Sequence, residues 1–238
     1  MGKVVTFDKL PARPSGGAST ATIVAAGEMK EMAAEFVRVA PGQKWFDTVP
    51  RGSDGYLFML DGAGTISHGT SRQRLAAQSF ATVQEGVAFA VENDGSTPAN
   101  LVKVIAPPKP KDATPGFAGG IAVAERANTP VLDLPRDKKK RIYFAGPRAA
   151  KTERGHAMIV VYEKETVTGP HHHPNAESMF VILDGALQFT VNGEQVVVAP
   201  GQAAVFGLND RHGLHVADGH SGASFLEFHI PAAYTTVR

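Results

Sequence analysis

The sequence predicts an all-β protein made of two units of the same fold, and three observations support this prediction. Glycine (25) and proline (16) make up 41 of the 238 residues, and they separate short runs rich in Val, Ile and Phe. Short apolar runs between turn residues are typical of all-β proteins. Residues 187–191 and 194–198 flank Asn192-Gly193, a turn that favours a hairpin because both positions need positive φ. The third observation is an internal repeat.

In chain order, residues 1–33 are predicted as an N-terminal arm. The first repeat, residues 34–107, is expected to form strands at 35–39, 56–60, 64–68, 79–83, 88–92 and 100–106. Residues 108–155 are rich in Pro, Gly and charge, and we interpret them as a linker and inter-barrel segment. An extra strand is expected near 131–134 and a short helical turn around 122–126. The second repeat, residues 156–231, is expected to form strands at 157–163, 178–183, 187–191, 194–198, 203–206 and 223–230, before a tail of residues 232–238.

The two repeats align without gaps at an offset of 123 residues over most of their length. Leu60-Asp61-Gly62 returns as Leu183-Asp184-Gly185, and this offset places His212 over Phe89 and Glu177 over Asp54. A repeat of this length indicates two structural units of one fold. The residues that suit a metal occur only in the second repeat, so the first retains the scaffold without the ligands.

The composition excludes several classes of function. With 43% hydrophobic and 20% charged residues, the chain can bury a real core, and its net charge of +1 favours neither nucleic acid nor an anionic membrane as a partner. The basic run at 138–141 follows Asp133 and Asp137, so we interpret it as a solvated linker. No stretch approaches 18 apolar residues, and residues 1–5 do not resemble a secretory signal. We therefore expect a cytoplasmic protein, and the absence of cysteine excludes disulfides and thiolate ligands.

The most informative segment is His171-His172-His173-Pro174-Asn175-Ala176-Glu177, together with His212. Residues at i and i+2 of a strand face the same side, so His171 and His173 can share one ion while His172 points away. Glu177 would add an oxygen donor, and His212 would arrive from another strand. Nitrogen and oxygen donors without thiolate suit iron, manganese, nickel, cobalt or zinc. Histidine triplets also occur in solvated loops, and Gly169-Pro170 is a turn signal, so the triplet alone leaves both interpretations open.

These residues resemble the cupin superfamily. Its first motif runs G, five residues, HxH, three or four residues, E, six residues, G, and His171-x-His173-x-x-x-Glu177 fits the ligand spacing. The closing Gly185 comes one residue late. In the second motif only His212 is retained at a ligand position, while Asn209 takes the place of a glycine. Asparagine tolerates the left-handed backbone that this turn needs.

The resemblance implies two tandem cupin barrels (double-stranded β-helix, or jelly roll) joined by the Pro/Gly-rich linker. Residues 34–107 would be a degenerate N-terminal barrel and residues 156–231 the metal-binding C-terminal barrel. It also implies that His171, His173, Glu177 and His212 hold one divalent transition metal, with iron or manganese favoured and zinc, nickel or cobalt as alternatives. Edge strands and the arm favour a homodimer.

Similar cupins with this ligand set include dioxygenases, oxalate decarboxylases and sugar isomerases, so the resemblance leaves the reaction open. We favour a dioxygenase that acts on a small oxygenated organic compound. The alternatives are a non-redox isomerase, lyase or hydrolase, such as a ureidoglycine aminohydrolase-like enzyme, and a bicupin that binds metal or ligand without turnover. The ligand order E-x-H-x-x-x-H of that aminohydrolase differs from the order found here.

Two further residues are candidates for acid–base catalysis. His229 and Glu227 share parity on the last predicted strand, so both face inward if Phe225 does. Either could move a proton near the metal, although barrel interiors also hold paired histidines with no chemical role. His215, three positions after His212, should face the other way. We see no separate helical domain or basic face that would bind DNA.

Overall fold

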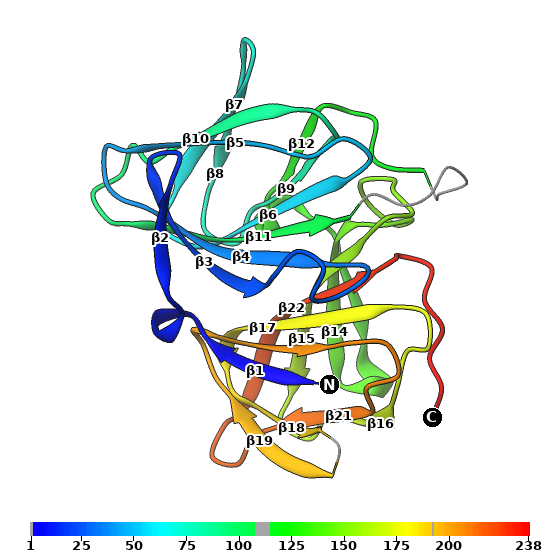
Figure 1. The fold of residues 1–238 in the computed structure, drawn as a ribbon. Coiled ribbons are helices and arrows are strands. Elements are labelled where there is room, and N and C mark those ends of the chain that lie inside the picture. Colours follow the sequence, from blue (N-terminus) through cyan, green and yellow to red (C-terminus); the bar gives the residue numbers. More distant parts are fainter. Residues whose placement is uncertain (1, 108–114, 192) are drawn as a thin grey trace. The chain divides into compact units, whose positions relative to one another are not determined.

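The computed structural model describes residues 2–107, 115–191 and 193–238, and the described elements are β-strands and three-residue 3-10 helices (Figure 1). This confirms the all-β prediction. The described residues fall into two compact units. The N-terminal unit comprises Leu10–Thr129 and Ala150–Arg154, and the C-terminal unit comprises Met1–Lys9, Pro130–Ala149 and Gly155–Arg238.

The N-terminal unit contains one seven-stranded and one four-stranded antiparallel sheet, of strand orders β12-β9-β6-β11-β4-β3-β2 and β5-β10-β7-β8. Its elements are β2 (Ala12–Ser15), β3 (Ala18–Val24), β4 (Ala33–Val39), β5 (Lys44–Thr48), β6 (Asp54–Asp61), β7 (Gly64–His68), β8 (Ser71–Leu75), β9 (Phe80–Val83), β10 (Ala88–Glu92), β11 (Ala99–Ala106), β12 (Ile121–Ala124) and η2 (Arg126–Asn128). The helical turn predicted around 122–126 lies a few residues later, at the 3-10 helix Arg126–Asn128, while Ile121–Ala124 pairs with β9 because tertiary pairing overrides weak local preference.

The C-terminal unit repeats this plan, with strand orders β1-β20-β17-β22-β15-β14-β13 and β16-β21-β18-β19. Its elements are β1 (Lys3–Thr6), η1 (Phe7–Lys9), β13 (Val131–Leu134), η3 (Pro135–Asp137), β14 (Lys139–Ala145), β15 (His156–Glu163), β16 (Val167–His171), β17 (Glu177–Gly185), β18 (Leu187–Val191), β19 (Glu194–Val198), β20 (Gln202–Phe206), β21 (His212–Val216) and β22 (Gly222–Ile230). Asn192 of the predicted hairpin turn and residues 108–114 of the predicted linker lie outside the described residues, while Gly193 has φ 90°.

Every strand of one unit has a counterpart in the other, so the internal repeat is a repeat of structure. The pairing register agrees with the sequence offset: Val91 pairs with Ile66, and Leu214 pairs with Phe189. Each residue of the second pair lies 123 positions after its counterpart (214 minus 91, and 189 minus 66). By the same register Phe89 is the counterpart of His212.

The repeated Leu-Asp-Gly turn has a backbone reason. Gly62 and Gly185 have φ of 76° and 69°, and a Cβ on either would strike the carbonyl oxygen of Pro98 or Gly222. Only glycine adopts this conformation easily and permits such a close backbone approach. The same residue is therefore required where β6 and β17 end.

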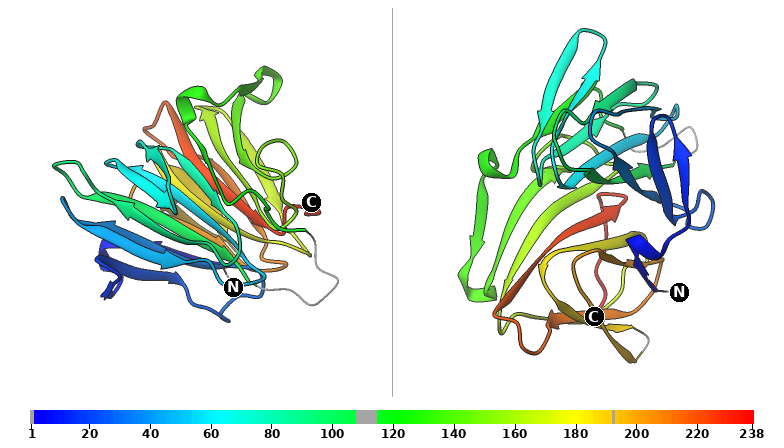
Figure 2. Two further views of the ribbon diagram at one scale, coloured as in Figure 1. Left: turned by 90° about the horizontal axis from the view of Figure 1, so that it is seen from above. Right: turned by 90° about the vertical axis from the view of Figure 1, so that its left-hand side faces the viewer.

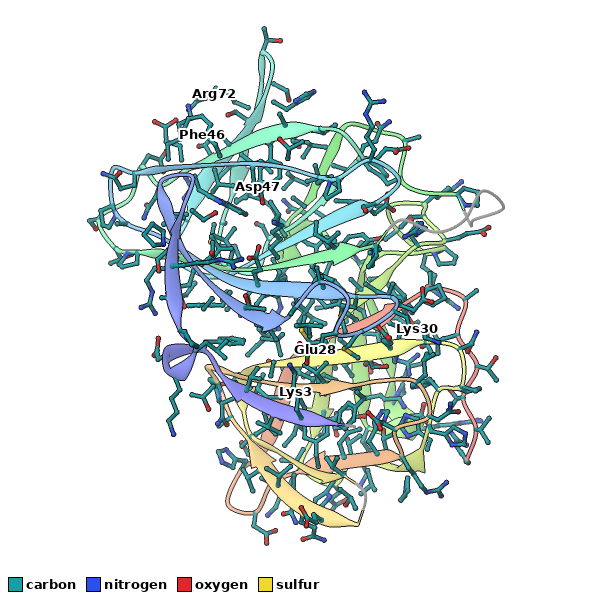
Figure 3. All side chains as sticks on the ribbon, viewed as in Figure 1. Lys3, Glu28, Lys30, Phe46, Asp47 and Arg72 are labelled. Carbon is teal, nitrogen blue, oxygen red and sulfur yellow. The ribbon has the colours of Figure 1, made fainter. Side chains whose placement is uncertain are left out.

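Each unit has its own apolar core between its sheets, and strand alternation determines which side chains enter it. In the N-terminal unit Trp45 is buried beside Phe89, with ring centroids 5.4 Å apart, while the next residue, Phe46, is 60% exposed (Figure 3). In the C-terminal unit the corresponding core gathers Phe180, Phe189 and other residues around them.

Both ends of the described chain belong to the C-terminal unit. Strand β1 pairs with β20 at the edge of the seven-stranded sheet (Figure 2). At the other end, Val237 exchanges two backbone hydrogen bonds with His172, at 2.9 and 3.0 Å. The chain's last residues are thus bound beside the histidine segment. The described residues contain no helix that is long and apolar enough to cross a membrane.

Candidate metal centre

Three of the four predicted metal ligands come together in the C-terminal unit. His171 ends β16, His212 begins β21, and the two are paired across the ladder of these strands. His173 follows two residues after His171. One potential ligand atom from each of the three imidazoles lies within 4.8 Å of the other two. We call these residues the three-histidine group.

Backbone carbonyl groups orient all three rings. The Nδ1 atoms of His171, His173 and His212 each lie 2.9 Å from a carbonyl oxygen, those of Gly169, Thr235 and Asp210 respectively. A carbonyl oxygen can only accept, so each Nδ1 carries the proton and donates it. The Nε2 atom of each neutral ring then presents a lone pair, which is the tautomer of a metal-ligating histidine fixed by a second hydrogen bond.

The Nε2 atoms of His173 and His212 are buried and have no hydrogen-bond partner among the described residues. A buried polar atom without a partner is destabilising, so two such atoms directed to one place indicate that something else satisfies them. Burial lowers the pKa of His212 to about 3 and that of His173 to about 4, and it also lowers the pKa of His171. The rings are therefore neutral at pH 7, the protonation state that binds metal.

Glu177 is buried at the start of β17 but does not join the three-histidine group. The next residue, Ser178, hydrogen-bonds His229, and adjacent residues of a strand face opposite sides of the sheet. Asp54, the counterpart of Glu177, is likewise buried, and it accepts hydrogen bonds from the backbone N–H of Phe117 at 2.9 and 3.0 Å. Glu177 as a fourth ligand remains a prediction of the sequence.

The late position of Gly185 in the motif is the sequence feature that explains why Ser178, and not Glu177, faces His229. The motif places six residues between its glutamate and its glycine, and counting back from Gly185 gives Ser178 rather than Glu177. The strand also has a register shift between Ile182 and Asp184. The longer spacing therefore directs Ser178 to the inner side.

The two predicted acid–base residues lie next to the three-histidine group. His229 Nε2 is 2.5 Å from Glu227 Oε1, its Nδ1 is 2.8 Å from Ser178 Oγ, and its ring centroid is 4.8 Å from that of His173. Phe225 is fully buried in the core, as the parity argument required. Since an ionised Glu227 can only accept, Nε2 donates to it, while Nδ1 and the Ser178 hydroxyl share the second hydrogen bond.

The charge of Glu227 is set by its neighbours. Burial alone would raise the pKa of this carboxyl, but the charge and hydrogen bond of His229, with the nearby Arg141, lower it to about 2. Glu227 is therefore an anion at pH 7 and holds the His229 ring in a fixed orientation. The pair can accept and return a proton beside the three-histidine group.

A cavity of about 750 Å³ opens onto these residues. His171, His173, Glu227 and His229 line it, together with apolar side chains, tyrosines and several basic residues. Tyr162, whose hydroxyl is 2.5 Å from Thr168 Oγ1, has a pKa raised by burial and stays protonated. The site thus combines a nitrogen donor group, an acid–base pair and room for a small organic molecule.

Sequence reasoning missed the contribution of the tail. Tyr234 stacks on His229, with ring centroids 4.0 Å apart and an interplanar angle of 23°. Thr235 supplies the carbonyl that orients His173, and Asn175 secures the tail by accepting a hydrogen bond from the N–H of Thr235 at 2.8 Å. Residues 232–238 show no periodicity in the sequence, so only the folded chain reveals that they complete the site.

Comparison with protein families identifies the second repeat. Residues 158–229 match the sequence model of the family described as Cupin domain. No curated protein matches the chain by sequence.

Solved structures share the fold over almost the whole chain. The protein YlbA from E. coli superposes with a TM-score of 0.79 at 11% identity, covering 96% of this chain and 90% of that one. A putative glyoxylate-induced protein from Pseudomonas aeruginosa gives 0.77 at 15% identity, with 99% and 89% covered. Oxalate decarboxylase from Bacillus subtilis, which has Mn(II) centres, gives 0.72 at 12% identity, with 98% and 78% covered. At these identities the likeness establishes the fold, two tandem cupin barrels.

Proposed function

Given a cupin domain at residues 158–229 in a chain of two cupin-fold units, we propose that the protein is a metal-dependent enzyme. Its proposed reaction is the oxygenation of a small organic compound by a dioxygenase mechanism. The observation that carries the proposal is the three-histidine group, in which each Nδ1 is bonded to a carbonyl and two buried Nε2 atoms lack partners. This pattern fits a divalent metal ion.

The donor set restricts the metal. Neutral imidazole without thiolate suits iron, manganese, cobalt, nickel or zinc, and the Mn(II) centres of a similar fold support iron or manganese as the first choices. His171, His173 and His212 would hold the ion, which would supply Lewis-acid or dioxygen chemistry to a substrate in the cavity. Glu177 would be a fourth ligand if its carboxylate turned inward.

The protein's own residues then supply orientation and proton transfer. His229 accepts or returns a proton at Nδ1, while Glu227 fixes the ring and stabilises its protonated form. Tyr234 covers one face of His229 and limits the access of water to it. Apolar cavity walls such as Phe180 and Leu214 favour a substrate with a compact apolar body.

The proposal is tested by oxygen uptake. The iron-loaded and manganese-loaded protein is screened in an oxygen electrode against small diketones and phenols, and consumption with at least one of them is expected. His212→Ala removes one histidine of the group and should abolish that consumption. His215→Gln, a change on the same strand outside the group, serves as the matched control and should retain it. Silence across the panel with metal bound would contradict the dioxygenase assignment.

A second candidate is non-redox proton transfer, as in an isomerase, lyase or hydrolase. The contact chain Ser178–His229–Glu227 beside the three-histidine group favours it, since oxygenation does not by itself require a buried acid–base pair. Hydrogen–deuterium exchange at the carbon next to a substrate carbonyl, followed by NMR without oxygen, separates the two reactions. Exchange that is lost in His229→Gln, with metal still bound, would favour this candidate; no exchange and no oxygen uptake would leave a bicupin without turnover.

The remaining expectations concern the protein's context. A homodimer and a cytoplasmic location follow from the sequence resemblance and composition, and both stay predictions. Light scattering of the purified protein tests the first and cell fractionation the second.

A further inference from the structure

The cavity beside the three-histidine group has an excess of positive charge. Its basic lining residues are Arg136, Lys138, Lys139, Arg141 and Arg238. Among its acidic lining residues, Glu165 pairs with Lys138, Asp137 lies 3.6 Å from Lys139, and Glu227 bonds His229. These pairs leave three arginines in the cavity without a direct ion-pair partner among the described residues; the Glu227 carboxylate acts on Arg141 only at longer range.

Arg141 differs from the other two because it lies within the barrel. It is half-buried on β14, on the same side as Tyr143, which packs against the core. Its one side-chain hydrogen bond among the described residues is a long one, 3.4 Å from Nη1 to the Tyr143 hydroxyl oxygen, and its Nε is buried without a partner. A guanidinium is always charged and offers five donors, so one that is partly desolvated with unused donors favours binding an anion.

From this geometry we propose that the cavity binds a small organic anion whose carboxylate is held by Arg141. The inference rests on the proposed function in one respect: the end of the ligand away from Arg141 would face the three-histidine group. The planar fork of arginine matches a carboxylate in a two-point contact. Val160, Phe180 and Leu214 line the same cavity, so an organic body fits it better than an inorganic anion does.

The test is a calorimetric titration of the metal-loaded, full-length protein with succinate, with its uncharged diamide, and with inorganic phosphate. Succinate should bind, the diamide should bind at least tenfold more weakly, and phosphate should bind more weakly than succinate. Arg141→Gln should weaken succinate binding about tenfold or more, because charged hydrogen bonds are lost. Arg141→Lys keeps the charge without the fork and should fall between. Arg136→Gln, a change in the same cavity, is the matched control and should alter binding less than threefold.

Repeating the titration in a metal-free variant distinguishes a failure of this inference from a failure of the proposed function. In His212→Ala, where no metal is expected, Arg141→Gln should still weaken the remaining succinate binding, whereas the metal content of Arg141→Gln alone should equal that of the wild type. If the wild-type protein binds no metal but still binds succinate in a manner that depends on Arg141, the proposed function is contradicted and the anion site is kept. Succinate binding that is absent at millimolar concentration, unaffected by both Arg141 variants, or matched by phosphate would overturn the anion site. If Arg141→Gln fails to fold, Arg141→Lys decides the outcome.

Discussion

The two units share strand order and register but use the centre of the barrel differently. In the N-terminal unit, Phe89 packs against Trp45 and the interior is closed by apolar contacts. At the counterpart position of the C-terminal unit stands His212, which meets His171 and His173 and leaves a buried Nε2 without a partner. One fold thus supports either a packed core or a polar centre. The histidines are therefore not needed for the fold, and we expect their buried Nε2 atoms without partners to destabilise the metal-free unit.

The largest difference in stability between the units should appear when the pH is lowered. Burial is the main cause that lowers the pKa of His156 and His173 to about 4 and that of His212 to about 3, below the usual 6.5. The unfolded chain would bind protons near pH 6.5, before the folded one does. The metal-free C-terminal unit should therefore lose stability as the pH falls from about 6.5 to about 4, with no further loss from these groups below about 3.

The N-terminal unit offers the contrast for this measurement, because its one histidine, His68, is exposed. Hydrogen-exchange protection factors of the chelated protein at pH 7 and pH 5 should fall in β21 and stay nearly constant in β10. An equal fall of the protection factors in both strands would show that buried histidines do not cause a difference in acid stability between the units.

The next largest effect should follow from opening the packed barrel. Phe89→Ala removes a buried ring from the N-terminal core and should lower the free energy of unfolding by about 3–5 kcal/mol, because it leaves a cavity. Urea denaturation measures this loss, and elemental analysis of the same variant should find the metal content unchanged. A loss of metal in Phe89→Ala would mean that the N-terminal unit takes part in the site.

Metal should stabilise only the unit that has the histidines. At a free metal concentration about 100 times the dissociation constant, binding to the folded state should add about 2.7 kcal/mol to stability. Thermal denaturation of chelated and reloaded protein measures the gain. The gain should persist in Phe89→Ala and vanish in His173→Ala; a similar gain in His173→Ala would place the metal elsewhere.

The smallest effect is expected at Glu177. Three imidazoles remain when its charge is removed, and strand alternation turns residue 177 away from the side where Ser178 meets His229. Glu177→Gln should therefore weaken metal binding only a few-fold, as measured by competition with a chelator. A loss of a hundredfold or more would restore Glu177 as the fourth ligand that the motif predicts.

The sequence alone predicted the two-unit all-β fold because that information is local and repeated. Alternating runs and the Leu-Asp-Gly turns mark the strands, and the 123-residue offset relates the units. The polar strand Ser71–Leu75 was not predicted. His171 and His212 were placed on strands without bounds for Val167–His171 or His212–Val216, because these segments lack apolar alternation. Their pairing comes from neighbouring strands instead.

The candidate site shows the same contrast between local features, which the sequence reveals, and long-range contacts, which it does not. The spacing His171-x-His173 and the parity of Glu227 and His229 are short-range features, and the folded chain brings each pair together. Arg141 and Tyr234 reach the cavity only through sheet pairing and the return of the tail, so no spacing in the sequence points to them. A one-residue change in spacing, at Gly185, accompanies the placement of Ser178 rather than Glu177 on the side that meets His229.

Elemental analysis of untagged wild-type protein and of His212→Ala, both purified without added metal, tests the central claim most directly. The account predicts about one iron or manganese ion per wild-type chain and almost none in the variant, with both proteins folded. A wild-type chain that holds no metal and takes none up on dialysis, or a variant with the same metal content as the wild type, would contradict it.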